Sequence, residues 1–371
     1  MKEVTVYTSR RVWFALLTVS ALTLSPYAAP AQQQQAPTQA QVHKPNVVIL
    51  ATGGTIAGAA ATGTQSGYTS GAVGIDAMLQ AVPGIDKLAN VKGEQVANVG
   101  SQDMSFDVLL KVAKRINELA AKPDVDGIVI THGTDTMEES AYFLNLTAKT
   151  DKPIVMVGSM RPSTAVSADG PLNLYNAVGV AADPKAKGRG VLVVMNDQIH
   201  AARSLTKTNT TSVDTFMSPT HGLAGTANYG KNVFYSMPVG KHTKQSEFDV
   251  SNVTQVPRVD IIYADADMKP DLIESSVAHG AKGIVIAGVG NGNMNKPSLD
   301  AAGRTVKQGV AVVRASRVPT GTVGRNVEVD DDELGLIASN ELNPQKARIL
   351  LTLALLKPRS SAELQKLFYT Y

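Results

Sequence analysis

The chain has 371 residues, a formal net charge of +3 and a hydrophobic fraction of 43%. One hydrophobic core seldom grows to this size, so two folded domains are expected. The small net charge argues against a nucleic-acid-binding protein. The absence of cysteine excludes disulfides, thiol nucleophiles and cysteine metal sites.

Residues 1–31 have the pattern of a bacterial export signal. Arg10 and Arg11 precede the apolar run 12–24, and the small residues at 29–31 offer a cleavage site. The run is shorter than the roughly 20 apolar residues of a membrane anchor. We therefore expect cleavage near Ala31, a periplasmic location and no membrane contact of the mature protein. The choice between the general secretory and twin-arginine routes stays open.

Residues 32–45 are rich in Gln, Ala and Pro and are expected to form a disordered tether. From residue 46 onward, short apolar runs that predict buried strands alternate with the apolar spacing of helices. One such helix is indicated by Leu109, Val112, Ile116 and Leu119. The strands expected in this part are 47–51, 96–99, 128–130, 154–157 and 191–195. This alternation predicts a larger N-terminal α/β domain with a parallel sheet over residues 46–235.

The alternation lapses over residues 236–257, which are polar and contain prolines, and this segment is predicted to be a linker. Apolar runs resume at 259–263, 283–287 and 311–314, followed by helices after Pro344 and near Ser361. We therefore expect a smaller C-terminal α/β domain over residues 258–371.

The stretch 128–139 takes a predicted strand into a predicted helix. Thr134 and Asp135 lie at this corner, and Thr136 followed by Glu139 has the spacing of a capping box. Ligands of open α/β sheets bind at the carboxyl ends of the strands. A cap accounts for one or two of these polar residues but not for all of them, so a ligand site and a simple helix cap remain equal alternatives from this stretch alone.

The first predicted strand ends in Gly53, Gly54 and Thr55. Glycines allow a backbone to approach a ligand closely, which makes Thr55 a candidate nucleophile and Gly54 a candidate substrate contact. No dinucleotide fingerprint is present, because Thr55 stands where the second glycine is needed. Segment 58–74 has the small, polar composition of a lid, in which Tyr68 is the only aromatic residue. The alternative is an ordinary flexible surface loop.

Two further strands are followed by polar candidates. Ser101 and Gln102 follow strand 96–99 and could hold the charged ends of a substrate. Lys207 lies beyond strand 191–195 and could be the base or proton carrier that a hydroxyl nucleophile requires, although a lone lysine would more often be a surface residue. Together, these polar groups at the ends of four strands predict a single site.

At these residues the chain resembles the bacterial type II, exported L-asparaginases and the related glutaminase-asparaginases. The two motifs of that family, A-T-G-G-T-I-A-G at 51–58 and T-H-G-T-D-T-M-E-E at 131–139, are intact. The similarity extends from about residue 46 to residue 371. It implies hydrolysis of L-asparagine to L-aspartate and ammonia through a threonine β-acyl-enzyme, without metal or cofactor. It also implies a homotetramer built from close dimers.

The resemblance further implies a role for each candidate residue. Thr55 matches the acylating nucleophile and Tyr68 its activating neighbour. Thr134, Asp135 and Lys207 match a rigid second catalytic set, in which Thr134 positions the attacking group and Lys207 relays protons. His132 is expected to be structural.

The substrate contacts implied by the resemblance come from both predicted domains. The contacts in the first domain are Gly54, Ser101, Gln102, Thr134 and Asp135, of which Ser101, Gln102 and Asp135 match residues that hold the substrate's α-carboxylate and α-ammonium groups. The contacts in the second domain, Asn293 and Glu328, match residues contributed by a neighbouring subunit.

Two alternatives remain. A glutaminase-asparaginase would hydrolyse both asparagine and glutamine. These substrates differ by one methylene group, and a binding site distinguishes such a difference by only about 1–3 kcal/mol. A periplasmic amino-acid-binding protein would also be exported, two-domain and α/β, but it would have no use for a hydroxyl on a lid together with Lys207.

Overall fold

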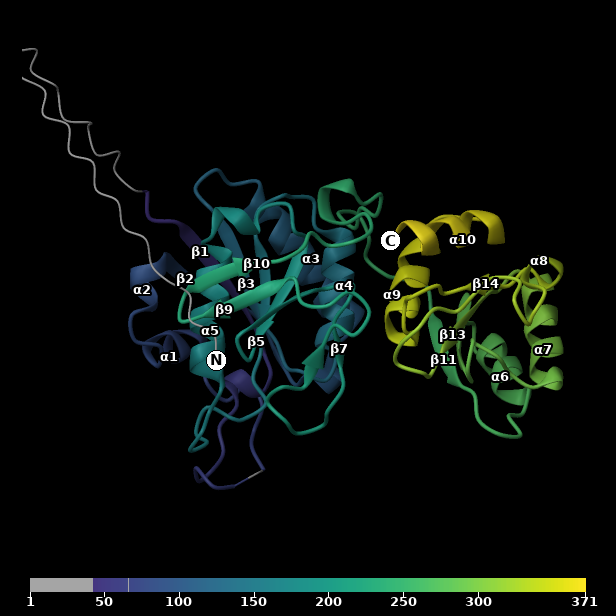
Figure 1. Cartoon of the computed structure of the whole chain (residues 1–371), viewed down its shortest axis with the longest axis horizontal. Coiled ribbons are helices and arrows are strands. Elements are labelled where there is room, and N and C mark those ends of the chain that lie inside the picture. The colour runs from purple at the N-terminus through teal and green to yellow at the C-terminus, as the bar shows by residue number, and fades with distance from the viewer. Residues whose placement is uncertain (1–42, 66) are drawn as a thin grey trace, which may run out of the picture. The chain divides into compact units, whose positions relative to one another are not determined.

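The computed structural model describes residues 43–65 and 67–371. The predicted export signal and residues 32–42 of the predicted tether lie outside the described residues. Within them the chain is a mixed α/β protein with a larger N-terminal sheet and a smaller C-terminal parallel sheet, as the sequence predicts (Figure 1). No helix of residues 43–65 and 67–371 is long and apolar enough to cross a membrane.

The larger sheet has eight strands in the order β10-β9-β6-β5-β4-β3-β1-β2. Strands β1 to β5 run parallel to one another. The strands are β1 (Asn46–Gly53), β2 (Asn90–Val99), β3 (Gly127–Thr131), β4 (Ile154–Val157), β5 (Val191–Met195), β6 (Gln198–Ala201), β9 (Gly225–Asn228) and β10 (Lys231–Phe234).

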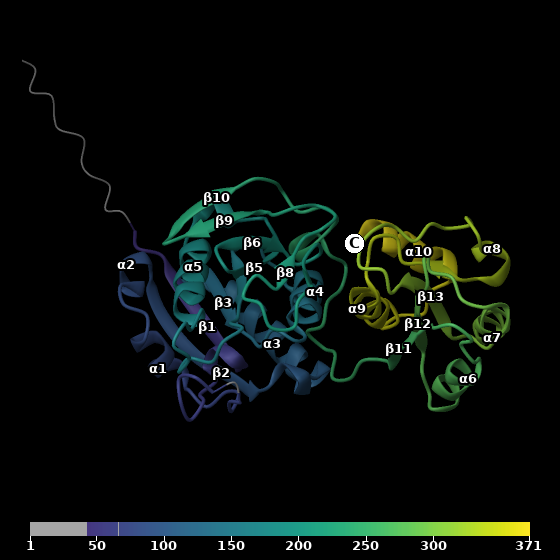
Figure 2. The ribbon, with the colours of Figure 1, turned by 60° about the horizontal axis from the view of Figure 1, so that its bottom comes forward.

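Helices cover both faces of this sheet (Figure 2). Successive side chains of a strand point to opposite faces, so Val48 and Leu50 of β1 pack with helices α3 and α4, while Val47 and Ile49 pack with α1, α2 and α5. Burial on both faces explains why the central strands read as continuous apolar runs. The helices are α1 (Ile75–Gln80), α2 (Ile85–Leu88), α3 (Phe106–Ala120), α4 (Met137–Thr147) and α5 (Gly170–Ala181).

At one edge of this parallel sheet β6, β9 and β10 are antiparallel, which the sequence reasoning did not anticipate. The turn between β5 and β6 consists of Asn196 and Asp197, which have φ values of 50° and 60°. A two-residue hairpin turn with positive φ at both positions is characteristic of Asn and Asp. This dipeptide was the sequence signal for a hairpin.

The order of strands reverses at β1, between β2 and β3. The chain passes from β1 to β2 on one side and then returns to β3 on the other side of β1. Such a reversal is the point where open α/β sheets bind ligands, outside the carboxyl ends of the strands. Both sequence motifs follow these two strands.

The smaller sheet is parallel, in the order β11-β12-β13-β14. Helices α6 and α7 pack on one face, and α9 and α10 pack on the other. The elements of this part are β11 (Val259–Tyr263), α6 (Asp271–Ala278), β12 (Gly283–Gly288), α7 (Lys296–Lys307), β13 (Ala311–Ser316), α8 (Asp331–Leu334), β14 (Ile337–Ala338), α9 (Pro344–Ala354) and α10 (Ser361–Thr370).

A separate two-stranded ribbon is formed by β7 (Thr206–Lys207) and β8 (Phe216–Met217). Between β10 and β11, a segment that the structure describes in full, the one regular element is the 3₁₀ turn η4 (Thr243–Gln245). The domain boundaries expected from the sequence, 46–235 and 258–371 with a linker at 236–257, stay predictions.

Candidate active site

The corners that follow β1, β2 and β3 touch one another. A Cβ atom added to Gly54, which has φ +85°, would lie 2.3 Å from the amide nitrogen of Gly133, and one added to Gly133 would lie 2.5 Å from Ser101 Oγ. Only glycine permits backbones to approach this closely. The contact gathers Thr55, Thr134 and Ser101, each no more than 6% exposed, at one edge of the sheet.

Thr55 contacts the phenol of Tyr68. The two hydroxyl oxygens are 2.6 Å apart, and either could be the donor. Tyr68 lies on segment 58–74, which folds back on the corner, since Ala59 pairs with Thr69 and the Val73 amide donates to the Ala57 carbonyl at 2.8 Å. The tyrosine is 42% exposed, so its hydroxyl contacts the buried Thr55 while part of the side chain faces solvent.

Residues 163 and 164 hold this segment in place, a role that the sequence reasoning missed. Ser163 donates from Oγ to the Gly58 carbonyl at 2.7 Å. Thr164 Oγ1 accepts a hydrogen bond from the Ala60 amide at 2.9 Å. The polar turn Pro162-Ser163-Thr164 was visible in the sequence, but nothing in the sequence places it against a segment a hundred residues earlier.

Lys207 reaches the corner that follows β3. Its Nζ atom donates to Thr134 Oγ1 at 2.9 Å and to Asp135 Oδ1 at 2.6 Å. The lysine side chain is 17% exposed and the aspartate side chain 59% exposed. A buried threonine hydroxyl therefore contacts a cation, and the other face of the carboxylate is open to solvent.

The other predicted contact residues of the first domain lie beside this pair. Ser101 Oγ accepts a hydrogen bond from the Asp135 amide at 3.1 Å, which joins the corner after β2 to the corner after β3. The Gln102 side chain is exposed, and its Nε2 atom donates to Asp103 Oδ2 at 3.1 Å.

The predicted capping box of Thr136 and Glu139 is wrong. Thr136 precedes α4 but makes no side-chain cap, because its hydroxyl donates to the Ser101 carbonyl at 2.7 Å instead. Glu139 faces Arg348, 3.4 Å away, and burial raises the pKa of its carboxyl. Both side chains join the helix start to other segments, which local spacing could not reveal.

The start of helix α9 contacts helix α4 at Glu138, which is 5% exposed. Glu138 accepts a hydrogen bond from Asn343 at 2.9 Å and lies 3.5 Å from Lys346 Nζ. Lys346 also donates to the Leu205 carbonyl, two residues before Lys207. Residues from the C-terminal part thus fix both α4 and the strand that carries Lys207.

His132 is buried beside the site. Its Nδ1 atom donates to the Gly133 carbonyl at 2.6 Å, and burial lowers its pKa to about 4. The ring is therefore neutral at pH 7, and its contact holds the Gly133 backbone. A second buried histidine, His200 on β6, contacts Ser218 Oγ at 2.9 Å, and burial lowers its pKa to about 4 as well.

These histidines predict acid destabilisation. The unfolded state takes up a proton below the ordinary pKa of 6.5, whereas the folded state resists it until about pH 4, so stability is complete above pH 6.5 and falls between pH 6.5 and 4. A shift of this size corresponds to about 3 kcal/mol per histidine. The melting temperature of His200→Gln should therefore fall less steeply over this range than that of the unsubstituted protein. Parallel melting curves would contradict the prediction.

Asn293 and Glu328, the two candidates from the C-terminal part, contact each other, with the amide of Asn293 donating to the carboxylate of Glu328. Among residues 43–65 and 67–371, no hydrogen bond or ion pair joins them to Thr55, Thr134 or Lys207. In a single chain the candidate residues therefore fall into two groups, one around Thr55 and Thr134 and the other formed by Asn293 and Glu328.

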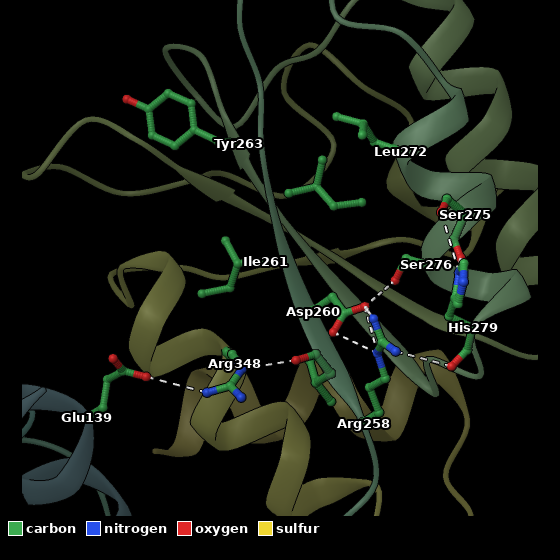
Figure 3. Close-up of a pocket in the computed structure, with 12 residues that line it drawn as sticks. Glu139, Arg258, Asp260, Ile261, Tyr263, Leu272, Ser275, Ser276, His279 and Arg348 are labelled. Atoms are coloured by element: carbon green, nitrogen blue, oxygen red, sulfur yellow. Dashed lines mark hydrogen bonds and ion pairs between the residues drawn. The ribbon is translucent and has the colours of Figure 1, made fainter. Parts of the chain in front are cut away.

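A pocket of about 600 Å³ lies along β11 and contains none of the predicted site residues. Figure 3 shows Arg348 between Glu139 and the strand, and the Arg258–Asp260 ion pair beside it. Arg348 donates from Nε to the Val259 carbonyl at 2.9 Å. These charges are already paired within the chain.

Comparison with known proteins assigns the chain to a family. The model described as "Asparaginase, N-terminal" matches residues 46–241, and "Glutaminase/Asparaginase C-terminal domain" matches residues 258–368. L-asparaginase 2 of Escherichia coli (strain K12) is 53% identical over 88% of this chain and 93% of its own length. Glutaminase-asparaginase of Pseudomonas fluorescens biotype A is 46% identical over 94% of this chain and 96% of its own length.

A solved structure agrees. The crystal structure of a probable cytoplasmic L-asparaginase from Campylobacter jejuni superimposes with a TM-score of 0.86 at 48% identity, covering 88% of this chain and all of the other. On the strength of two matched family models, close relatives and a shared fold, this chain belongs to the asparaginase and glutaminase-asparaginase family.

Proposed function

We propose that the protein is an exported L-asparaginase that hydrolyses the side-chain amide of L-asparagine through an ester on Thr55. The observation that carries the proposal is a pair of buried threonine hydroxyls at adjoining corners, each in contact with an acid–base group. Thr55 lies 2.6 Å from the Tyr68 phenol and Thr134 lies 2.9 Å from the Lys207 ammonium. A hydroxyl nucleophile needs such a partner.

In the first half-reaction Thr55 Oγ attacks the amide carbon while the Tyr68 oxygen accepts its proton. The carbon–nitrogen bond breaks, the nitrogen takes up the proton that Tyr68 received and leaves as ammonia, and the aspartyl group remains on Thr55 as an ester. In the second half-reaction water attacks the ester, Thr134 and Lys207 carry protons, and L-aspartate leaves with the threonine hydroxyl restored. General acid–base help of this kind contributes about 10²–10⁴-fold.

The remaining candidates hold the substrate's charged ends. Ser101 and Gln102 supply a hydroxyl and an amide for the α-carboxylate, while the solvent-facing side of the Asp135 carboxylate attracts the α-ammonium. Gly54 lets the substrate approach the nucleophile. Binding both ends fixes the amide carbon near Thr55, and orientation of this kind can lower a barrier by several kcal/mol.

Measuring ammonia release from asparagine and from glutamine, as kcat/KM at catalytic enzyme concentration, tests the proposal. A preference for asparagine supports it, and comparable values for both amides would favour the glutaminase-asparaginase alternative. An amino-acid-binding protein would bind either ligand without releasing ammonia.

Cleavage of the predicted export signal should remove the tryptophan fluorescence of the protein. The chain's single tryptophan is Trp13, inside the predicted signal, so removal of residues 1–31 should leave a mature protein without tryptophan emission. Emission spectra of protein purified from the periplasm, excited at a wavelength selective for tryptophan, check this. A tryptophan spectrum in that material would refute cleavage.

We further propose that the enzyme is a homotetramer of close dimers in which Glu328 and Asn293 complete the site of a neighbouring subunit. Two points support this: within the described residues of one chain no hydrogen bond or ion pair joins this pair to Thr55, and homo-oligomers usually have closed symmetry.

Complementation of two inactive variants tests the shared site. Thr55→Ala and Glu328→Ala, unfolded and refolded together in equal amounts, should regain activity in about a quarter of the sites if pairing is random. Each variant refolded alone is the control and should stay inactive. Mixed oligomers identified by mass spectrometry but lacking activity would place Glu328 outside a shared site.

A further inference from the structure

The C-terminal part contains an ion pair that is almost completely shielded from solvent. The side chains of Arg314 on β13 and Asp331 at the start of α8 are 1% and 0% exposed. Arg314 donates from Nε to Asp331 Oδ1 and from Nη2 to Asp331 Oδ2, both at 2.7 Å. Removing two charges from water costs several kcal/mol per ion, and a buried pair is often no more stable than well-packed apolar residues. Stability alone is therefore a weak explanation for this pair.

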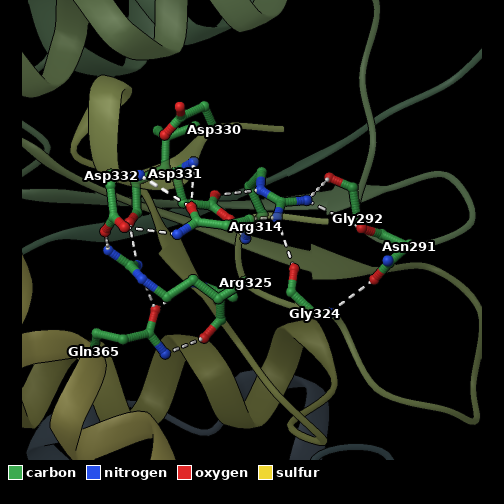
Figure 4. Close-up of polar contacts among 12 residues, drawn as sticks. Asn291, Gly292, Arg314, Gly324, Arg325, Asp330, Asp331, Asp332 and Gln365 are labelled. Carbon is green, nitrogen blue, oxygen red and sulfur yellow. Dashed lines mark hydrogen bonds and ion pairs between the residues drawn. The ribbon is translucent and has the colours of Figure 1, made fainter. Parts of the chain in front are cut away.

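The other N–H groups of Arg314 bind the backbone of two loops (Figure 4). Nη1 donates to the Asn291 carbonyl at 3.0 Å and to the Gly292 carbonyl at 3.3 Å, and Nη2 donates to the Gly324 carbonyl at 3.0 Å. A guanidinium has five N–H donors in a fixed fork, and each of them has a partner here. The group thus sets the separation of the two loops.

Asp331 completes the connection. Its Oδ2 atom accepts a hydrogen bond from the Asn326 amide at 2.9 Å, and its own amide donates to Asn326 Oδ1 at 2.9 Å. Between the loops, the Gly324 amide donates to Asn291 Oδ1 at 2.8 Å. Gly292 has φ +72°, and a Cβ atom there would lie 3.3 Å from Arg314 Nη1 and 2.8 Å from Val323, so this approach requires glycine.

These two loops carry Asn293 and Glu328. Asn293 follows Gly292 directly, and its backbone pairs with Val289 through two hydrogen bonds of 2.8 Å. Glu328 lies between the two ends of the second loop, which are fixed at Gly324 and Asn326 on one side and at Asp331 on the other. The Glu328 side chain is exposed and accepts a hydrogen bond from Asn293, so the position of its carboxylate depends on the backbones of both loops that Arg314 holds.

We propose that Arg314 and Asp331 are positioning residues that hold the Asn293–Glu328 pair in the geometry required to bind the substrate's α-ammonium group. This inference rests on the proposed function, in which that pair completes a substrate site. Neither residue touches substrate. A displacement of about 1 Å in a supporting group can lower the rate about 10²-fold. The rigid guanidinium of Arg314 is therefore well suited to fixing these two loops.

Arg314→Lys is the sharpest test, because an ammonium retains the charge but cannot reach both carboxylate oxygens and three loop carbonyls. The readout is the ratio of inhibition constants for L-aspartate and succinate, which carries the same two carboxylates without the ammonium group. In Arg314→Lys we expect inhibition by L-aspartate to weaken at least about tenfold, the scale of a charge-assisted contact, while inhibition by succinate changes far less. KM for asparagine should rise by more than kcat falls.

Two variants provide the comparison. Arg359→Lys alters a largely buried arginine that binds the Ala354 carbonyl and Glu247, and it should leave the inhibitor ratio unchanged. Asp331→Asn retains the shape and one acceptor, and it should shift the ratio in the same direction as Arg314→Lys. It also keeps the test decisive if the lysine variant does not fold.

The outcomes separate the inference from the function beneath it. A purely structural role would lower the active fraction or the melting temperature in Arg314→Lys and Asp331→Asn at an unchanged inhibitor ratio, and this would overturn the inference. Glu328→Gln is the benchmark, since it should lose the preference for L-aspartate directly. If it does so while the Arg314 and Asp331 variants do not, the inference fails and the proposed function stands. If the unsubstituted protein releases no ammonia from asparagine, the proposed function itself fails.

Discussion

Replacing Thr55 by alanine should reduce ammonia release from asparagine to background, a fall in kcat of at least about 10⁴-fold. Alanine has no oxygen with which to form the ester, and water is a far weaker nucleophile than a positioned hydroxyl. The fold should survive, because the close contact of this corner depends on Gly54 and Gly133. Binding of L-aspartate, measured by calorimetry, should therefore persist, since other residues hold its charged groups.

Thr55→Ser is the matched control for this substitution. Serine keeps the hydroxyl that lies 2.6 Å from Tyr68 and removes only a methyl group, so some turnover should remain. If the alanine variant kept activity within about tenfold of the unsubstituted enzyme, the ester would have to form on another residue. Thr134 would then be the next candidate.

The second large effect is expected for Lys207→Met, with a loss in kcat of at least about 10²-fold, the usual scale of general acid–base help. Methionine retains an apolar stem of similar length and removes the ammonium that contacts Thr134 and Asp135. Because the lysine is assigned to proton transfer, kcat measured from ammonia release should fall much more than KM rises. A similar fall in kcat/KM caused only by KM would assign Lys207 to substrate binding instead.

Lys149→Met is the control for loss of a partly buried lysine. Lys149 Nζ donates to the Ser246 carbonyl at 2.6 Å, away from both threonines, and burial lowers its pKa. This variant should change stability with little effect on kcat. Full activity in Lys207→Met would make Lys207 a structural residue.

Local sequence predicted the central strands and the corners of the site. β1 and β3 are buried on both faces, so they appear as continuous apolar runs. Parallel strands present their carboxyl ends at one edge, which is why Thr55 and Thr134 could be assigned to one site before their contacts were known. The apolar spacing of α3 also predicted this helix, and its residues Leu109 and Ile116 are buried as expected.

The start of α4 and one edge of the larger sheet were not predicted correctly from local sequence. The Thr136–Glu139 spacing matched a capping box, but Ser101 and Arg348 offered these side chains partners from distant segments. Such competition is decided by tertiary contacts, because a side chain can make a local or a distant hydrogen bond at similar cost. The antiparallel edge of the sheet was instead a missed turn signal, the Asn196-Asp197 dipeptide.

The amino-acid order alone determined which residue types stand at the strand ends, because that depends on hydrophobic periodicity and on short motifs within a few residues. Only the tertiary structure decided how these groups are held. Ser163 and Thr164 bind the segment that carries Tyr68, Lys346 binds the Leu205 carbonyl beside the strand of Lys207, and Arg314 binds the loop that carries Glu328. Each of these contacts joins side chains or backbone groups from separate segments, and their pairing depends on the packing of whole elements, which no local pattern encodes.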